Sequence, residues 1–317
     1  MHSRASVAII LMKIVIGSRG SRLALWQANW VQDRLAALGH AVEILIIKTS
    51  GDKLQNASLQ TSGAKGLFIK EIEEALLAGR ADLAVHSLKD LPTELPEGLL
   101  IAAVPEREDP RDALVAKAGQ TLQDLTQGAR IGTGSLRRQA QLLALRPDLE
   151  MIPMRGNVDT RLRKLDRGDC DALVLAGAGL KRLGLSSRIT YWFSEAELCP
   201  AVGQGALAIE ASARNQNILS AAKPLDHPPT HAAVRAERAM LQALGGGCQL
   251  PIAAHTSREG RELRLAGVVA HPAGTTVLRA TLSGSPENPE ELGVRVAQEL
   301  LKQGAQTLLN LQQAEVE

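Results

Sequence analysis

The chain of 317 residues has little of several things that mark whole classes of protein. Aromatic residues make up 2% of it, too few for the stacking platforms that bind single-stranded nucleic acids. No stretch approaches the roughly 20 apolar residues that a membrane-spanning helix needs. The formal net charge is +2, too small to indicate a polyanionic partner unless the charge is concentrated locally. We therefore expect a globular protein that binds neither nucleic acid nor membrane.

Cysteine is also scarce. Cys170, Cys199 and Cys248 are odd in number and far apart, which argues against a disulfide framework and against a zinc site. We expect a protein of the reducing cytoplasm with no bound metal. The apolar run 7–12 is shorter than the core of a signal peptide and no small-residue cleavage site follows it. We interpret residues 1–11 as an N-terminal extension and Met12 as an alternative start.

Short apolar runs alternate with amphipathic segments, a pattern typical of parallel strands joined by helices. Strands are expected at 13–17, 41–47 and 81–88, and a similar series begins near residue 129, with a strand over 170–180. The pattern predicts an α/β lobe at 12–105 with 205–225 and a second at 110–199. From residue 229 a helix, alternating strands and one last helix from Pro289 onward predict a small α+β domain at 229–317.

Three turns place arginine where a helix is expected to begin: "GSRGSRLAL", "GTGSLRRQA" and "RGNVDTRLRK". Ser21, Ser135 and either Asn157 or Asp159 are the expected N-caps. A cation there opposes the helix dipole, whereas free N–H groups beside a guanidinium make a good anion site. Each turn alone is equally consistent with a solvated helix start. Three such turns at the carboxyl ends of strands indicate a ligand with several carboxylates or phosphates, and no nucleotide-binding glycine motif is complete.

Two further residues are candidates for chemistry. Asp90 follows an expected buried strand in "HSLKDLP", where the local sequence favours a simple turn. At the mouth of an arginine-rich cleft it would instead hold an ionised carboxylate that moves protons or stabilises a developing cation. Cys248 in "GGGCQLP" is by type more often a small buried apolar residue, although the glycines permit the loop to present its thiol. Neither His231 nor His255 shows a pairing motif for a cysteine hydrolase, so the thiol is also a candidate attachment point.

Several segments together resemble the porphobilinogen deaminase family: "SRLALWQA", "KGLFIKEIEEALL", "ADLAVHSLKDLP", "EREDPRDA", "GTGSLRRQAQL", "RGNVDTRL", "LAGAGLKRLG", "PAVGQGALAIE" and "GGGCQLPIAA". The resemblance implies two lobes like those of periplasmic solute-binding proteins, a central cleft between them and a small C-terminal α+β domain. It also implies that Cys248 carries a dipyrromethane cofactor through a thioether. Four porphobilinogen units would be added to this primer with loss of ammonia, and hydrolysis would release linear hydroxymethylbilane.

The resemblance implies roles for individual residues. Asp90 would be the catalytic carboxylate. The cofactor carboxylates would be held by Lys89, Ser135, Arg137, Arg138 and Arg161. Incoming substrate or the extending chain would be held by Arg19, Ser21, Arg155 and Arg182. The mobile segment over the cleft would include Lys65 and Phe68. Two positions depart from the family pattern: Arg22 receives no role, and Gly134 stands where a hydroxyl is common.

Two other classes share part of this pattern. A solute-binding protein would have the same two lobes, but no export signal is recognised and the third domain with its cysteine would be unexplained. A cysteine-dependent acyl transferase would share the nucleophile but lacks a recognisable base and oxyanion site. We therefore expect a monomeric cytoplasmic transferase of tetrapyrrole biosynthesis whose partner is the small molecule porphobilinogen.

Overall fold

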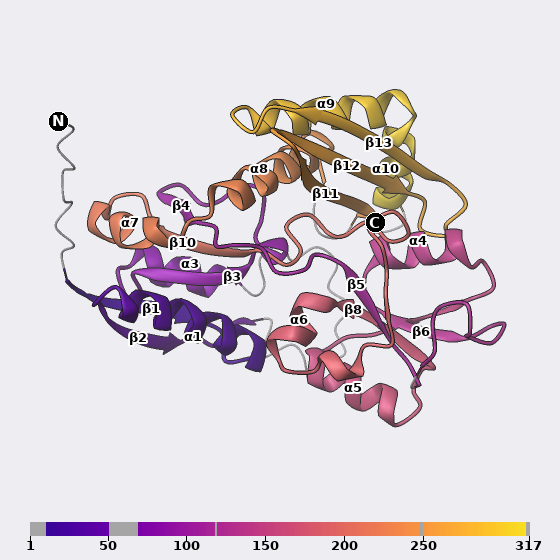
Figure 1. Cartoon of the computed structure of the whole chain (residues 1–317), viewed down its shortest axis with the longest axis horizontal. Coiled ribbons are helices and arrows are strands. Elements are labelled where there is room, and N and C mark those ends of the chain that lie inside the picture. The colour runs from indigo at the N-terminus through magenta and orange to yellow at the C-terminus, as the bar shows by residue number, and fades with distance from the viewer. Residues whose placement is uncertain (1–10, 51–68, 118, 247–249, 315–317) are drawn as a thin grey trace.

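The computed structural model describes residues 11–50, 69–117, 119–246 and 250–314, and the side chains of these up to residue 310. Within these residues the chain forms two five-stranded sheets and one three-stranded sheet, each covered by helices (Figure 1). The predicted fold class is confirmed: two sheet-rich α/β lobes are followed by a small α+β unit. Among the described residues, no helix combines the length and apolar character that crossing a membrane requires.

The first sheet has the order β2 (Ala41–Ile46), β1 (Lys13–Ser18), β3 (Leu83–Ser87), β10 (Leu207–Ser212) and β4 (Leu99–Ala103). β1 is parallel to β2 and β3, whereas β10 is antiparallel to β3 and β4. Apolar residues of α1 (Arg22–Ala37) and α7 (Gln216–Ala222) pack on one face of the sheet. The other face is covered by α3 (Lys70–Leu77). The carboxyl end of β3 continues into the short helix η1 (Leu88–Asp90).

The second sheet repeats this plan with the order β7 (Glu150–Pro153), β6 (Arg130–Thr133), β8 (Ala172–Ala176), β5 (Asp112–Val115) and β9 (Tyr191–Trp192). Here β5 is the strand that runs antiparallel to β8. One face is packed by α4 (Leu136–Leu145) and the other by α5 (Val158–Asp166) and α6 (Gly177–Arg182). Residues 104–111 and 193–206 connect the two sheets, so the chain passes between the lobes twice.

The C-terminal unit is an antiparallel meander of β11 (Ile252–Glu259), β12 (Glu262–Ala270) and β13 (Val277–Gly284). Its core is completed by α8 (Pro228–Ala243), α9 (Pro289–Lys302) and α10 (Ala305–Ala314). Short 3-10 turns occur at η2 (Ser186–Arg188) and η3 (Lys223–Leu225). Figure 1 places this unit beside β4 and β10 of the first sheet and α4 of the second.

Two predicted elements were wrong in extent. The expected strand over 170–180 ends at Ala176, and α6 begins at the next residue, because the apolar run continues unchanged from a buried strand into a buried helix. The single last helix is two helices, α9 and α10. Gly304 lies between them with a φ of 99°, a left-handed conformation that ends a helix and that glycine adopts readily.

Candidate functional site

Asp90 lies at a small cavity where the first sheet ends. Its side chain is exposed on η1, immediately after β3. The cavity has a volume of about 80 Å³. Residues of α1, α3, β3 and the turn before α1 line it together with Asp90: Arg19, Ser21, Leu23, Ala24, Gln27, Ile69, Ile72, Val85, His86 and Ser87. The structure therefore brings three predicted site residues, Arg19, Ser21 and Asp90, to one cavity.

The wall formed by α1 is held by hydrogen bonds. Ser21 is the N-cap of α1 as predicted, because its side chain accepts a hydrogen bond from the backbone N–H of Ala24 at 3.3 Å. Gln27, which is 2% exposed, donates from Nε2 to Ser87 Oγ at 2.7 Å. This bond ties α1 to the end of β3 and leaves little freedom in the wall that faces Asp90.

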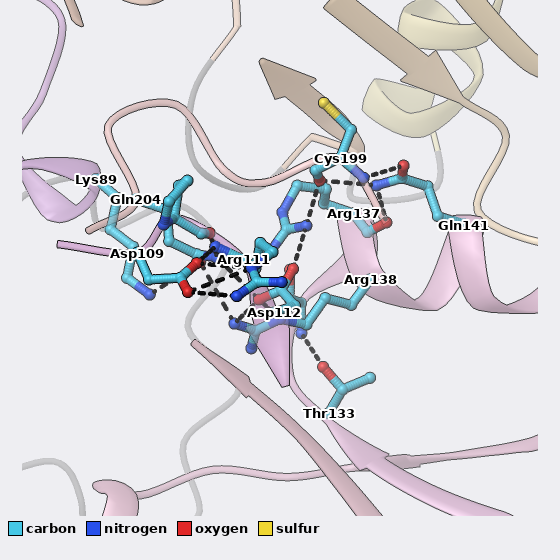
Figure 2. Close-up of polar contacts among 12 residues, drawn as sticks. Lys89, Asp109, Arg111, Asp112, Thr133, Arg137, Arg138, Gln141, Cys199 and Gln204 are labelled. Carbon is cyan, nitrogen blue, oxygen red and sulfur yellow. Dashed lines mark hydrogen bonds and ion pairs between the residues drawn. The ribbon is translucent and has the colours of Figure 1, made fainter. Parts of the chain in front are cut away.

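A buried ion-pair cluster lies at the start of the second sheet (Figure 2). Asp112 of β5 is completely buried, and its two carboxylate oxygens lie 2.8 Å from Arg137 Nη1 and 2.7 Å from Arg138 Nη2. Both arginines are also buried, in the first turn of α4. Burial alone would raise the pKa of Asp112, but the two guanidinium groups outweigh it and hold this pKa well below its usual range. These arginines are therefore not a solvated helix start.

A side-chain amide extends the cluster toward Asp90. Gln204 donates from Nε2 to Asp112 Oδ1 at 2.9 Å, and its Oε1 accepts from Lys89 Nζ at 3.4 Å. The pKa of Lys89 is lowered to about 8, chiefly by burial; Arg138 and Arg137 also lower it, and Asp90 and Asp112 raise it. A bound carboxylate would therefore stabilise the charged form of Lys89.

Arg161 of α5 adds a further cation to this region. Its Nε is sealed from solvent and makes no hydrogen bond with the described residues. Burial lowers the pKa of Arg161 to about 10; the charge of Arg138 adds to this and Asp90 opposes it. An orphaned guanidinium nitrogen next to a surplus of cations matches a ligand that brings several carboxylates. The donor set present therefore fits a dipyrromethane, whose rings carry acetate and propionate groups.

Arg182 stands at the junction of the lobes. It donates from Nη2 to the carbonyl oxygen of Gly205 at 2.7 Å and lies over the ring of Trp26 at 5.6 Å. Burial lowers its pKa to about 10, with Glu108 opposing. Arg155 is different, because it is exposed and its side chain forms no hydrogen bond or ion pair with the described residues. The structure thus does not join Arg155 to the other predicted residues.

The capping prediction for α4 is right in position but not in hydrogen bonding. Ser135 occupies the N-cap position of α4, but its side chain makes no capping hydrogen bond. Its backbone N–H instead donates to Thr133 Oγ1 at 3.2 Å, so the threonine hydroxyl stabilises the turn. In the third turn Asn157 is the N-cap and accepts from the N–H of Thr160 at 2.9 Å. The residues Cys248, Lys65 and Phe68 lie outside the described part of the chain.

Sequence reasoning missed the residues that organise the cluster. Asp112, Gln141 and Gln204 received no role. The side chain of Gln141 nevertheless holds the backbone of Cys199: its Oε1 accepts from the N–H at 2.9 Å, and its Nε2 donates to the carbonyl oxygen at 3.2 Å. An acidic residue opening an apolar strand was the available signal for Asp112. The pairing of that strand with β8, which brings Asp112 to α4, is visible only in the fold.

Comparisons with known proteins identify the family of the chain. The family model "Porphobilinogen deaminase, dipyromethane cofactor binding domain" matches residues 14–220, and "Porphobilinogen deaminase, C-terminal domain" matches residues 231–302. The porphobilinogen deaminase of Desulforudis audaxviator is 54% identical over 300 residues, which cover 94% of this chain and 97% of that protein. That of Geotalea uraniireducens is 50% identical over 301 residues, which cover 94% of each.

Solved structures give a weaker likeness. The methionine-binding protein MetQ is 14% identical with a TM-score of 0.43, covering 66% of this chain and 89% of that one. Two family models match most of the chain, and relatives about half identical match nearly all of it. These matches show that the chain belongs to the porphobilinogen deaminase family.

Proposed function

We propose that the chain is a hydroxymethylbilane synthase. It joins four porphobilinogen units head to tail on a dipyrromethane primer, releases ammonia at each addition and then hydrolyses the linear tetrapyrrole from the primer. The observation that carries this proposal is the Asp90 cavity beside a buried surplus of cations, in a chain of this family. A ligand whose every ring bears two carboxylates matches that surplus in charge.

Cys248 is the proposed attachment point for the primer. The other two cysteines are 2% and 1% exposed, and burial raises the pKa of Cys170 and brings that of Cys199 to about 12. Neither forms a thiolate readily at neutral pH, so both are poor nucleophiles. When bound, the dipyrromethane supplies the free α-carbon of a terminal pyrrole ring for bond formation. Its carboxylates would be held by Lys89, Ser135, Arg137, Arg138 and Arg161.

Asp90 is the proposed catalytic residue. The exposed Asp90 carboxylate at the mouth of the cavity accepts a hydrogen bond from the pyrrole N–H of the substrate and stabilises the positive charge that develops on that ring. The C–N bond of the protonated aminomethyl group breaks, and its electron pair leaves with the nitrogen as neutral ammonia. Arg19 and Ser21 at the cavity donate to the substrate carboxylates. Arg155 and Arg182 would bind the extending chain, and Lys65 and Phe68 would cover the cleft.

Intact mass tests the attachment. We expect the purified protein to be heavier than its sequence by one dipyrrole, before and after acid denaturation, because a thioether survives acid. Cys248→Ser abolishes both the added mass and turnover, whereas Cys170→Ser keeps both. In Asp90→Ala the primer stays attached and ammonia release falls by a factor of about 10² or more. An unmodified and fully active protein would refute the attachment.

Four narrower proposals accompany the activity. We propose that the protein works as a monomer in the cytoplasm and binds no nucleic acid; the mild net charge and few aromatic residues support the last of these. We also propose the domain limits 12–105 with 205–225, 110–199 and 229–317. The separate hydrophobic clusters of the two sheets and of the C-terminal unit support these limits.

A further inference from the structure

Three titratable side chains lie behind the Asp90 cavity and have no part in the proposed mechanism. They are Glu73 of α3, His86 of β3 and Glu210 of β10. His86 Nε2 lies 3.0 Å from Glu210 Oε2, and the two side chains are 7% and 0% exposed. His86 pairs with Ala208 of β10, and Glu210 is two residues further along that strand. The two side chains therefore project from the same face of the sheet, the face that α3 covers.

The cluster contains more negative groups than it can neutralise. Glu210 Oε1 and Glu73 Oε1 are both sealed from solvent and make no hydrogen bond with the described residues. Burial raises the pKa of Glu73 to about 7, and the charge of Glu210 adds to this while His86 opposes it. Of the other strands that pack on α3, β4 has no titratable residue and Lys13 of β1 is paired with Glu43. One proton on Glu73 therefore relieves the repulsion between the glutamates.

His86 connects this cluster to the site. His86 lines the same cavity as Asp90, Arg19 and Ser21. Its one side-chain hydrogen bond among the described residues is that with Glu210. When one imidazole nitrogen donates to a carboxylate, the tautomer is set and the other nitrogen of the neutral ring is an acceptor. Porphobilinogen carries an aminomethyl group, protonated at neutral pH, for which such an acceptor is a suitable partner.

We propose that Glu210 and Glu73 are positioning residues for porphobilinogen. Glu210 accepts a hydrogen bond from Nε2 of His86 and so sets the tautomer in which Nδ1 accepts from the aminomethyl group of the bound substrate, and Glu73 faces this pair from α3. This inference rests on the proposed function, because that function assigns the cavity to porphobilinogen. It adds a specificity-determining residue, His86, and the carboxyl groups that orient its ring.

The first experiment reads the protonation directly. Holoprotein labelled with [¹⁵N]histidine is titrated by NMR, and the His86 signals are assigned by their loss in His86→Gln. In the neutral ring we expect the proton on Nε2, because the Glu210 carboxylate accepts a hydrogen bond from that atom. The amide of Glu210→Gln can either accept from Nε2 or donate to it, so the tautomer with the proton on Nδ1 becomes populated. Glu74→Gln, an exposed neighbour on α3, leaves the signals unchanged. A neutral ring with its proton on Nδ1, or an unchanged tautomer in Glu210→Gln, would overturn the proposal.

The second experiment uses porphobilinogen turnover in protein whose primer content has been verified by mass. In Glu210→Gln and His86→Gln the KM rises about tenfold, the factor for one lost hydrogen bond, with a much smaller change in kcat. The step near pH 7 in kcat/KM disappears in Glu73→Gln, because an amide does not titrate. An unchanged KM in both variants contradicts the role of His86. Absence of primer and turnover in the unmodified protein instead refutes the proposed function.

Stability against pH gives an independent readout for Glu73. Its pKa in the folded chain lies above the ordinary value of 4.5, so the folded state binds more protons than the unfolded state between about pH 4.5 and 7. The contribution of this group to stability therefore falls as the pH rises through that window and is constant above it. Denaturant midpoints of Glu73→Gln lack this fall, whereas Glu74→Gln retains it. Identical curves for both variants would show that Glu73 does not hold the proton.

Discussion

At the scale of single residues, the site is a set of cations whose charges the protein only partly balances. Asp112 neutralises one of its two arginine neighbours, and Gln204 links it to Lys89 without adding charge. Arg161 keeps one nitrogen without a partner among the described residues. A buried charge that lacks a partner is costly, so a ligand that brings carboxylates recovers this cost on binding.

The charge of Lys89 depends on pH, so its contact with the primer carboxylates can be tested by changing the pH. Its pKa of about 8 in the ligand-free protein lies below the ordinary 10.5, so the amine loses its proton as the pH rises through 8. We expect the loading of primer-free protein with porphobilinogen, followed by intact mass, to fall between pH 7 and 9. In Lys89→Arg the guanidinium stays charged, and the fall is reduced. Equal pH curves for both proteins would exclude Lys89 as a contact of the primer.

At the scale of elements, the turn before β10 sets where the lobes meet. Gly205 has a φ of 88°, and its carbonyl oxygen accepts from Arg182 Nη2 and from the N–H of Glu108. A Cβ placed on Gly205 would lie 2.2 Å from the carbonyl oxygen of Glu108. The two segments that pass between the sheets therefore touch here, at a point where a side chain has no room.

Alanine substitutions at two glycines distinguish the cost of a close contact with Glu108 from the cost of a left-handed backbone conformation. Gly205→Ala meets both the backbone of Glu108 and a left-handed φ, so we expect a loss of stability of about 3 kcal/mol or more. Gly184→Ala is the matched control, because its φ is 71° but no atom lies within 4 Å of the added Cβ. It costs about 1 kcal/mol. Urea denaturation measures both, and similar losses would show that the contact with Glu108 relaxes easily.

At the scale of the whole molecule, ion pairs join segments far apart in the chain. Arg107, just before the second lobe, contacts Glu237 of α8 at 2.6 Å, and Glu237 also accepts from the N–H groups of Gly203 and Thr256. This pair is buried and ties the C-terminal unit to both connecting segments. Arg22 of α1 and Asp159 of α5 lie 3.0 Å apart across the lobes, but their side chains are 59% and 35% exposed.

The two pairs should differ strongly in their contribution to stability. Glu237→Gln leaves the Arg107 charge buried without a counterion, and we expect a loss of about 3 to 5 kcal/mol in the free energy of unfolding. Asp159→Asn breaks an exposed pair, for which the loss is under about 1 kcal/mol and shrinks further at high salt. Chemical denaturation at low and high ionic strength measures both. A comparable loss in the two variants would mean that the Arg22–Asp159 pair holds the lobes together.

The sequence by itself determined the alternation of strands and helices, the change of pattern near residue 229, and Asp90 with the cations near it. Those features depend on local spacing, on turns that favour particular residues and on motifs in family order. Ser21 is an example, because a cap needs only its own helix. The extents of α6 and α9 were wrong because an apolar run does not show where a buried strand or helix ends.

Only the tertiary structure decided which charges meet. Asp112 reaches Arg137 and Arg138 through the pairing of β5 with β8, and Glu210 reaches His86 through the return of β10 to the first sheet. The partners are separated by 25, 26 and 124 residues. No local rule gives such a contact, because burial and charge pairing depend on distances in space that the packed sheets create.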